Sequence, residues 1–164
     1  MKKLLSSLFV IFIFSGCVTF GQSFDWNLRG GLNLMKAHGT HKDPAVLYHL
    51  GAQAGIRIAS FGFYGEALYS MHENQYGGSS IAYFVPSLLG KIFWQKHMFM
   101  ELGGSMLSKI GDSSVTEDIL NPDKKLFMLV GFGAHFSKIQ LSLRGIMKPS
   151  QSYGVIQLTA AVKF

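Results

Sequence analysis

The chain has 164 residues, enough for one domain, with 48% hydrophobic residues, 15% charged residues and a formal net charge of +6. This composition excludes a disordered chain, which would be polar and charged. Nineteen glycines argue against an all-helical protein, because an interior glycine weakens a helix by roughly 1 kcal/mol. The basic residues form no run or arginine-rich stripe, so no nucleic-acid partner is expected.

Residues 1–21 are predicted to be a secretory signal peptide. Lys2 and Lys3 give a positive start, an apolar run follows at 4–14, and small residues come after it. The run is too short for a membrane anchor, which needs about 18–20 apolar residues. We expect cleavage after Gly21, so that residues 22–164 form one mature domain with a net charge of about +4.

Cys17 is the one cysteine of the chain, and it marks a competing processing site. The sequence Phe14-Ser15-Gly16-Cys17 resembles a lipobox, in which Cys17 would be lipidated and become the first residue. A lipobox usually has leucine where this chain has Phe14, so ordinary cleavage is favoured. The remaining chain has no thiol for a disulfide or for thiolate chemistry.

The mature chain alternates apolar and polar residues with a period of two, which is the pattern of β-strands. In the last segment, Ile156, Leu158 and Val162 share one face, while Gln157 and Thr159 share the other. No run of 18 apolar residues predicts a transmembrane helix. The predicted strands are residues 24–35, 48–58, 61–72, 81–94, 98–110, 126–137, 139–148 and 153–164.

The connections between these segments alternate in length. Tight turns are expected at Ala59-Ser60, Gln95-Lys96 and Ser137-Lys138. Outer-membrane barrels have short periplasmic turns, longer external loops and an even number of strands. The sequence therefore predicts an all-β fold, a transmembrane antiparallel up-and-down β-barrel of eight strands, with both chain ends in the periplasm and side chains filling the bore. The longer, external links are 36–44, 73–80, 111–125 and 149–152.

The fourth segment departs from this pattern in two ways. Pro86 lies inside it and cannot donate a ladder hydrogen bond, so we expect a bulge or an early end of the strand there. Its inward face carries Tyr83, Val85, Leu89 and Phe93, whereas the other segments predict a narrow, polar lumen.

Charged residues on the inward faces are the first candidate site. Because a charge in a packed bore must be paired, we expect the two acids each to bridge several bases and to plug the lumen. The alternative is a path for small anions, which conductance across a planar bilayer would reveal. The predicted lumen charges are Arg29, Arg57, Glu66, Lys91, Glu101, Lys109 and Arg144.

Outward aromatic residues near the strand ends are the second candidate feature. On the predicted topology they all lie at the periplasmic boundary, as in the aromatic girdle of a membrane barrel. They are Phe24, Trp26, Phe61, Trp94, Phe136 and Phe164.

Two groups of residues suggest chemistry, and we expect neither to perform it. His135-Phe136-Ser137 resembles the His-x-Ser pair of lipid A deacylases, but no Asp or Glu follows Ser137 to complete a triad, and Lys138 replaces the usual asparagine. His38, His41, His49 and Asp43 could form a metal site, but His38 and His41 fall on a predicted external loop and are expected to be solvated. No catalytic residue, metal or cofactor is therefore predicted.

Three stretches resemble the small outer membrane protein β-barrel domain family of Bacteroidetes, which includes PorT-like proteins: Phe20-Gly21-Gln22, the opening at 28–34 (LRGGLNL) and the strand at 50–55 (GAQAG after Leu50). The resemblance covers residues 23–164 and extends to OmpA-type eight-stranded barrels. The final strand, with Phe164 last, is similar to a barrel-assembly signal. The family implies insertion by the barrel-assembly machinery. The chain is short for PorT, so PorT's role in secretion is not carried over.

The main functional hypothesis is a non-enzymatic outer-membrane barrel with a structural or recognition role carried by loops 36–44 and 111–125. Its expected partners are outer-membrane lipid and lipopolysaccharide, with the barrel-assembly machinery during insertion, and we expect a monomer. One alternative is an accessory barrel of a secretion or envelope assembly. Another is a soluble lipocalin-like binding barrel, which the outward apolar band opposes.

The processing site is testable by the intact mass of the mature protein purified from envelopes. We expect a chain that begins at Gln22 and carries no lipid, because small residues flank Phe20 as ordinary cleavage requires. A diacyl or triacyl adduct on Cys17 would show that the lipobox is used instead.

Overall fold

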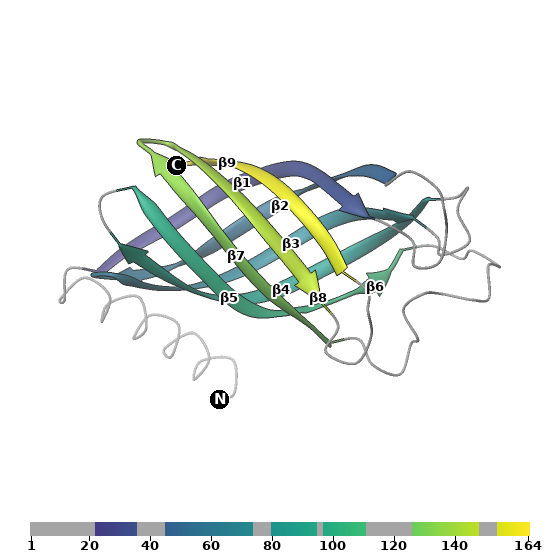
Figure 1. Cartoon of the computed structure of the whole chain (residues 1–164). Helices are drawn as coiled ribbons and strands as arrows, with labels where there is room; N and C mark the ends of the chain where they lie inside the picture. The colour runs from purple at the N-terminus through teal and green to yellow at the C-terminus, as the bar shows by residue number, and fades with distance from the viewer. Residues whose placement is uncertain (1–21, 36–44, 74–79, 95–96, 111–125, 148–153) are drawn as a thin grey trace, which may run out of the picture.

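A computed structural model describes residues 22–35, 45–73, 80–94, 97–110, 126–147 and 154–164. They form one closed antiparallel β-barrel, seen from the side in Figure 1. The strands are β1 (Gln22–Met35), β2 (Ala45–Ile58), β3 (Phe61–Glu73), β4 (Ser80–Trp94), β5 (Met98–Met106), β6 (Ser108–Lys109), β7 (Leu126–Phe136), β8 (Ile139–Met147) and β9 (Gly154–Lys163).

Chain neighbours pair around the wall, and β1 pairs with β9 to close it. The pairing is staggered, so a path from partner to partner around the barrel returns to β1 ten residues further along, at Met35 instead of Asp25. A stagger of ten over eight strands tilts the strands by about 40° and leaves a bore that side chains can fill. The path runs Asp25, Gly55, Tyr64, Leu89, Gly103, Leu129, Ile146, Val155 and Met35.

β5 and β6 are one wall strand, interrupted opposite Pro86. Ser87 pairs with Ser105 on one side of the interruption and Phe84 pairs with Ser108 on the other, so the register is unchanged. On the side of β4 that faces β3, Pro86 pairs in register with Ala67. The expected bulge or early end at Pro86 is therefore wrong. The proline lacks only its own N–H, and β4 continues through it.

The tight turns at one end of the barrel have the backbone conformation that such turns need. Ala59 and Ser137 have positive φ angles of 52° and 54°, as expected for two-residue hairpin turns. We call this the turn-side end; β1 begins and β9 finishes there (Figure 1). The opposite end is the loop-side end. The predicted turn at 95–96 and most of the long links lie outside the described residues.

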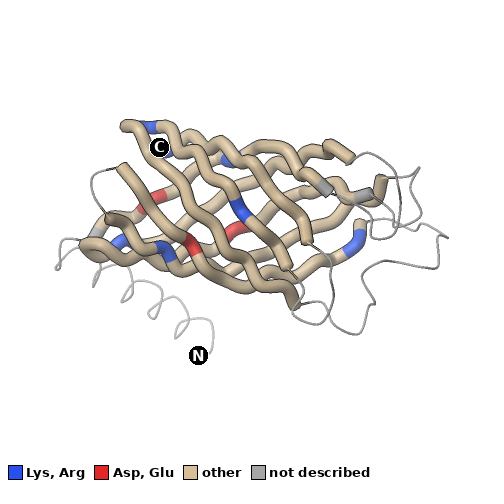
Figure 2. The backbone as a smooth tube through the Cα atoms, in the orientation of Figure 1, with Lys and Arg blue, Asp and Glu red and all other residues tan. Residues whose placement is uncertain are grey.

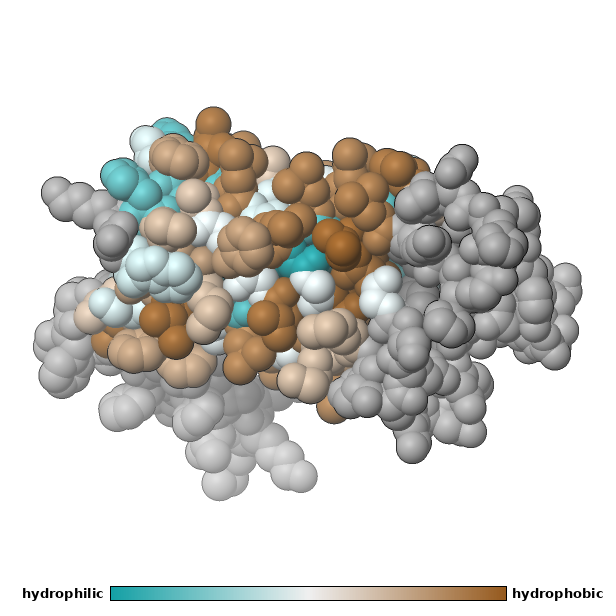
Figure 3. Space-filling view, in the orientation of Figure 1, coloured by the Kyte–Doolittle hydropathy of each residue, from teal (hydrophilic) through white to brown (hydrophobic). Residues whose placement is uncertain are grey.

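Along every strand, buried and exposed side chains alternate. Large apolar residues occupy the exposed positions, and Figure 3 shows that they cover much of the visible face. The two most exposed among them are Leu88 (76%) and Phe63 (69%). Such a surface is unfavourable in water and suits an apolar solvent. No helix within the described ranges has the length and apolarity to cross a membrane.

The bore has an apolar side as well as a polar one. Buried apolar side chains cluster on the inward faces of β3, β4, β5 and β7, with single members on β8 and β9 and between β5 and β6, and they include the four inward residues of the fourth predicted segment. The apolar inward face predicted for the fourth segment is therefore confirmed, and it belongs to a larger apolar cluster. The cluster consists of Tyr64, Leu68, Ile81, Tyr83, Val85, Leu89, Phe93, Phe99, Leu107, Phe127, Leu129, Ile146 and Val155.

The seam between β1 and β9 is reinforced at the turn-side end. The backbone N–H of Phe164 donates to the carbonyl of Trp26 (3.1 Å), and the two rings stack with centroids 4.4 Å apart. On the inward face, the Lys163 ammonium lies 2.6 Å from the Asp25 carboxylate. Phe164 therefore ties the last strand to the first by a backbone bond and a ring contact.

Phe164→Ala is expected to destabilise the barrel by about 0.5–1.5 kcal/mol more than Phe61→Ala, because only Phe164 has a stacked partner across the seam. Phe61 is a matched control, since the two residues are similarly exposed (59% and 57%) at the same end. Urea unfolding of the refolded mature chain in phospholipid vesicles measures both. Equal losses would mean that the stack contributes nothing to closure.

Candidate functional site

Five of the seven predicted lumen charges meet in the middle of the bore. They are Arg29 on β1, Glu66 on β3, Lys91 on β4, Glu101 on β5 and Arg144 on β8, and all five are buried. In Figure 2 most charged positions lie in the middle of the barrel and toward the turn-side end. We call these five residues the lumen cluster.

Arg144 is the centre of the lumen cluster because it bonds both carboxylates. Its Nη1 and Nη2 donate to the two oxygens of Glu66 at 2.8 and 2.9 Å. Its Nε and Nη2 donate to the two oxygens of Glu101, the second at 3.1 Å. A guanidinium can make two such paired contacts because its donors lie in a rigid planar fork.

Arg29 also bonds Glu66. Its Nη1 donates to Glu66 Oε2 at 2.5 Å, and its Nη2 donates to the hydroxyl of Ser142 at 3.2 Å. The lumen cluster thus joins strands that are far apart in the sequence: β1, β3, β4, β5 and β8. Removing one member would leave a buried charge without its partner, which is costly.

The lumen cluster has three cations and two carboxylates, and Lys91 is the cation with the weakest ion pair. Its ammonium is 3.6 Å from Glu101 and donates to Gln53 Oε1 at 2.8 Å. It also lies 4.7 Å from the centres of the Tyr64 and Phe99 rings. The lumen cluster has no third carboxylate to pair with Lys91. Because the faces of aromatic rings attract cations, the apolar side of the bore stabilises the Lys91 charge instead.

Gly131 makes room for the central ion pair. A Cβ at this inward position of β7 would lie 2.9 Å from both Arg144 Cγ and Glu101 Oε1, and 3.0 Å from the Leu143 carbonyl oxygen. The glycine therefore lets a large guanidinium and a carboxylate share one level of a narrow bore.

A second, uncharged network fills the polar side nearer the loop-side end. Asn33 Nδ2 donates to the Ser70 hydroxyl (2.9 Å), and Asn33 Oδ1 accepts from Gln157 (2.9 Å) and faces His49 Nδ1 (2.9 Å). Because an amide oxygen only accepts, Nδ1 of His49 donates, and its Nε2 accepts from Thr159 at 3.0 Å. His49 is thus a bonded lumen histidine.

The remaining two predicted lumen charges lie away from the cluster. Arg57 is half-buried at the turn-side end, where its Nε donates to the Ala59 carbonyl (3.1 Å). Lys109 is half-buried at the loop-side end. Sequence reasoning missed one ion pair: Asp25 bonds Lys163 (2.6 Å) and accepts from the Tyr64 hydroxyl (3.1 Å). The inward parity of Asp25 and Lys163 was the available signal.

The six predicted outward aromatics are all exposed, and all lie at or next to strand ends on the turn side. The loop-side end has an outward aromatic group that the sequence reasoning did not name. It comprises Tyr48, Tyr69 and Phe84, and the rings of Tyr48 and Tyr69 are 6.3 Å apart. Outward aromatics therefore flank the apolar surface at both ends.

The residues considered for catalysis and for metal binding do not assemble a site within the described ranges. Ser137 lies in a turn, and the ring of His135 contacts Phe93 and His97 instead. His38, His41 and Asp43 lie outside the described residues. Nowhere in those ranges do three or more potential metal ligands group together.

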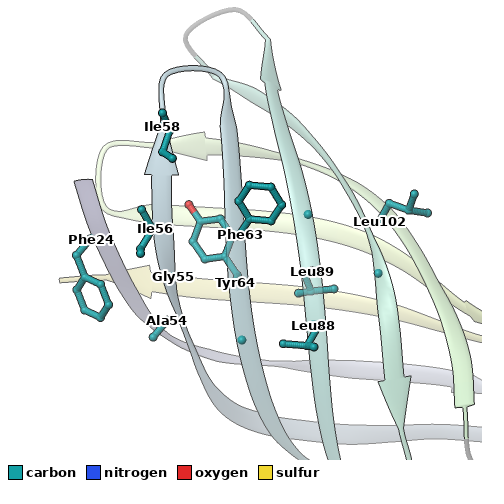
Figure 4. A pocket seen from close by; sticks show the side chains of 13 residues that line it. Phe24, Ala54, Gly55, Ile56, Ile58, Phe63, Tyr64, Leu88, Leu89 and Leu102 are labelled. Carbon is teal, nitrogen blue, oxygen red and sulfur yellow. The ribbon is translucent and has the colours of Figure 1, made fainter. Parts of the chain in front are cut away.

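The outward surface has two shallow hollows on either side of Leu88, of about 710 and 830 Å³. Figure 4 shows the first, with Phe63, Leu88 and Leu102 around it. Small outward residues make the hollows, among them Gly65, where a Cβ would meet nothing within 4 Å. Their lining is mostly apolar and belongs to the outer surface, although Gln53 and Glu66 of the inward face also border the second hollow.

Comparison with solved structures places this barrel beside outer-membrane barrels. The N-terminal β-barrel domain of Pseudomonas aeruginosa OprF superposes with a TM-score of 0.50 at 10% identity, covering 85% of this chain and 97% of that chain. Neisserial surface protein A has a TM-score of 0.48 at 16% identity, covering 87% of this chain and 97% of that chain. Yersinia pestis Ail in a phospholipid nanodisc has a TM-score of 0.46 at 14% identity, covering 87% of this chain and 100% of that chain. At these identities the likeness concerns the fold.

No family model and no curated protein matches the chain. The strand pairing and the likeness to the OprF domain show the fold, which is a closed eight-stranded antiparallel barrel of the outer-membrane kind. The likeness to PorT-like proteins stays a prediction.

Glu101→Gln and Arg144→Met are each expected to destabilise the barrel by about 3–5 kcal/mol, since each leaves buried charges with fewer partners. The double variant is expected to lose less than the sum of the two, because its partners are removed together. Urea unfolding followed by fluorescence of the two tryptophans measures all three.

Lys138→Met is the control, since Lys138 is an exposed basic residue in a turn and its loss should change stability by no more than about 0.5 kcal/mol. Strictly additive losses in the double variant would show that Glu101 and Arg144 do not act as a pair.

Proposed function

We propose that this protein is a non-enzymatic integral barrel of the bacterial outer membrane, with its chain ends in the periplasm. The observation that carries the proposal is the surface: large apolar side chains occupy the exposed positions of the described strands, while the charges lie inside. Water would favour the reverse arrangement, and hydrocarbon requires this one. The aromatic groups at both ends suit the two membrane–water interfaces.

Because bonded side chains fill the lumen, a role as a scaffold is better supported than a role as a channel. Arg29, Lys91 and Arg144 are each 1% exposed and bonded across the bore. An anion path would need those donors to be free and the bore to be open. The role for the cell then belongs to the barrel ends, as a structural element or by recognition through loops 36–44 and 111–125, which lie outside the described residues.

The alternative of a soluble lipocalin-like binder is disfavoured by the same features. Such a binder keeps a ligand cavity inside and a polar surface outside, whereas here ion pairs fill the middle of the bore. An accessory role in a secretion or envelope assembly remains a second proposal. Cross-linking in intact envelopes, followed by identification of the captured partner, tests it.

The depth dependence of an outward charge tests the membrane proposal. Leu158→Arg, in the middle of β9, is expected to cost about 2–4 kcal/mol, and Val162→Arg, near its turn-side end, at most about 1 kcal/mol. The two positions share a strand and are similarly exposed (51% and 47%), so only their depth in a bilayer distinguishes them. Reversible unfolding in phospholipid vesicles measures both.

Near-zero costs at both positions would contradict the proposal, because water tolerates arginine at either one. A mature chain that stays monomeric in buffer without detergent would contradict it independently. Both experiments test whether lipid or water surrounds the outer surface, and neither result depends on the ion pairs of the lumen cluster.

A further inference from the structure

Four basic side chains from different parts of the chain gather at the turn-side opening of the bore. Arg57 lies one residue before the end of β2, His97 precedes β5, His135 lies near the end of β7 and Lys163 ends β9. The other three residues, and Lys91 of the lumen cluster beyond them, are all near enough to act electrostatically on His135. We call these four residues the basic mouth; they are separate from the lumen cluster.

Ring contacts hold three of these residues next to one another. The Arg57 guanidinium lies 4.0 Å from the centre of the Phe93 ring, which is 6.0 Å from the His135 ring. The His135 ring is in turn 6.0 Å from that of His97, whose Nδ1 lies 3.2 Å from the His135 carbonyl oxygen. The side chains therefore form a continuous, ordered row across the opening.

Several donors of this row are unused. Arg57 uses the face of its guanidinium on Phe93 and its Nε on Ala59, and within the described residues both of its Nη groups lack a hydrogen-bond partner. Among the same residues, Nε2 of His97 and both ring nitrogens of His135 have no partner either. A neutral imidazole donates through one nitrogen, so His135 offers one donor, and His97, whose Nδ1 donates to the His135 carbonyl, donates from Nε2 only as an imidazolium. Arg57 and His135 are half-buried and His97 is exposed, so these donors can be reached from water.

Among the four residues of the basic mouth, Lys163 is paired with a carboxylate, whereas Arg57 has no carboxylate partner in the described part of the chain. Asp25 is the one acidic side chain described at this end, and it is bonded to Lys163 and Tyr64. Glu66 and Glu101 lie deeper and are bonded to Arg144. The carboxylates of the interior are all bonded, whereas the Nη groups of Arg57 at the mouth keep donors that no described carboxylate uses.

We propose that the basic mouth binds a phosphate group. A phosphate monoester carries a charge of about −1.5 to −2 and offers three oxygens in a tetrahedral arrangement, so it can accept from donors on several sides of an opening. A planar carboxylate offers two oxygens in one plane. The guanidinium of Arg57 supplies the fork that suits phosphate oxygens, and the imidazoles supply single donors.

Two sources could supply that phosphate, free phosphate in the surrounding water or a lipid headgroup. The headgroup is within reach because the outward ring of Phe136 stacks on His97, with centroids 6.1 Å apart, so the mouth lies at the level of the outward aromatics. The chemistry is the same for both sources, and the experiment separates them.

The test follows the histidine side-chain NMR signals of the folded mature chain in maltoside micelles, which contain no phosphate. Inorganic phosphate is titrated at constant pH and ionic strength against chloride. We expect saturable shifts of His97 and His135, while the buried His49 and His72 give unchanged signals in the same spectrum. Arg57→Gln should weaken binding about tenfold or more, since a charged hydrogen-bond donor is lost.

Lys138→Gln is the matched control, because it removes an exposed basic residue at the same end that does not belong to the mouth. In the lipid arm, a short-chain phosphatidic acid is added to the same micelles. Shifts with lipid that block the response to free phosphate identify the headgroup as the ligand, and shifts with free phosphate alone identify the solute.

Three results would overturn the proposal: equal shifts in chloride and phosphate, no shift of His97 or His135 in either arm, or an Arg57→Gln variant that binds as the wild type does. None of these results bears on the membrane proposal, which depends on the outer surface.

Discussion

Closure of the backbone hydrogen-bond ladder is the constraint on which this structure depends. In an apolar solvent no outside group can satisfy a free N–H or C=O, so a sheet must have no open edge. The pairing of β1 with β9 removes the last two edges. Phe164 secures that seam from outside by its stack on Trp26, and Lys163 secures it from inside by its ion pair with Asp25.

The narrow bore follows from this closure, and the buried chemistry follows from the bore. With eight staggered strands, inward side chains from opposite walls must touch. Arg144 reaches Glu66 and Glu101 for this reason, and Gly131 leaves the volume that their contact needs. The surplus cation, Lys91, is stabilised by the rings of Tyr64 and Phe99. The apolar side of the bore thus complements the polar side.

Since side chains fill and pair within the middle of the barrel, interaction with other molecules is left to its outer surface and its two ends. In the proposed membrane location, the outer surface would contact lipid hydrocarbon. At the turn-side end, the Nη groups of Arg57 and the ring nitrogens of His135 have no hydrogen-bond partner among the described residues, and they can be reached from water. In the interior, both carboxylates of the lumen cluster are bonded to cations, although Arg29 Nε is a buried donor without a partner in the described part of the chain.

Alternation along the chain was enough to predict eight wall strands, and the observed strand edges lie within three residues of the predicted ones. The same parity predicted that Arg29, Glu66 and Arg144 face inward, because successive residues of a strand point to opposite faces. Parity could not show which charges meet, since the stagger between strands decides that. Asp25 and Lys163, near opposite ends of the mature chain, become partners only when the barrel closes.

Pro86 illustrates the same division. A proline in a strand predicts a defect, but only the sheet shows that its missing N–H interrupts one neighbour and leaves the register intact. The sequence by itself determined the strands, their inward faces and the apolar outer surface, because these depend on neighbours along the chain. The tertiary structure alone decided the pairing of the lumen cluster and the assembly of the basic mouth, because both depend on the stagger with which distant strands meet.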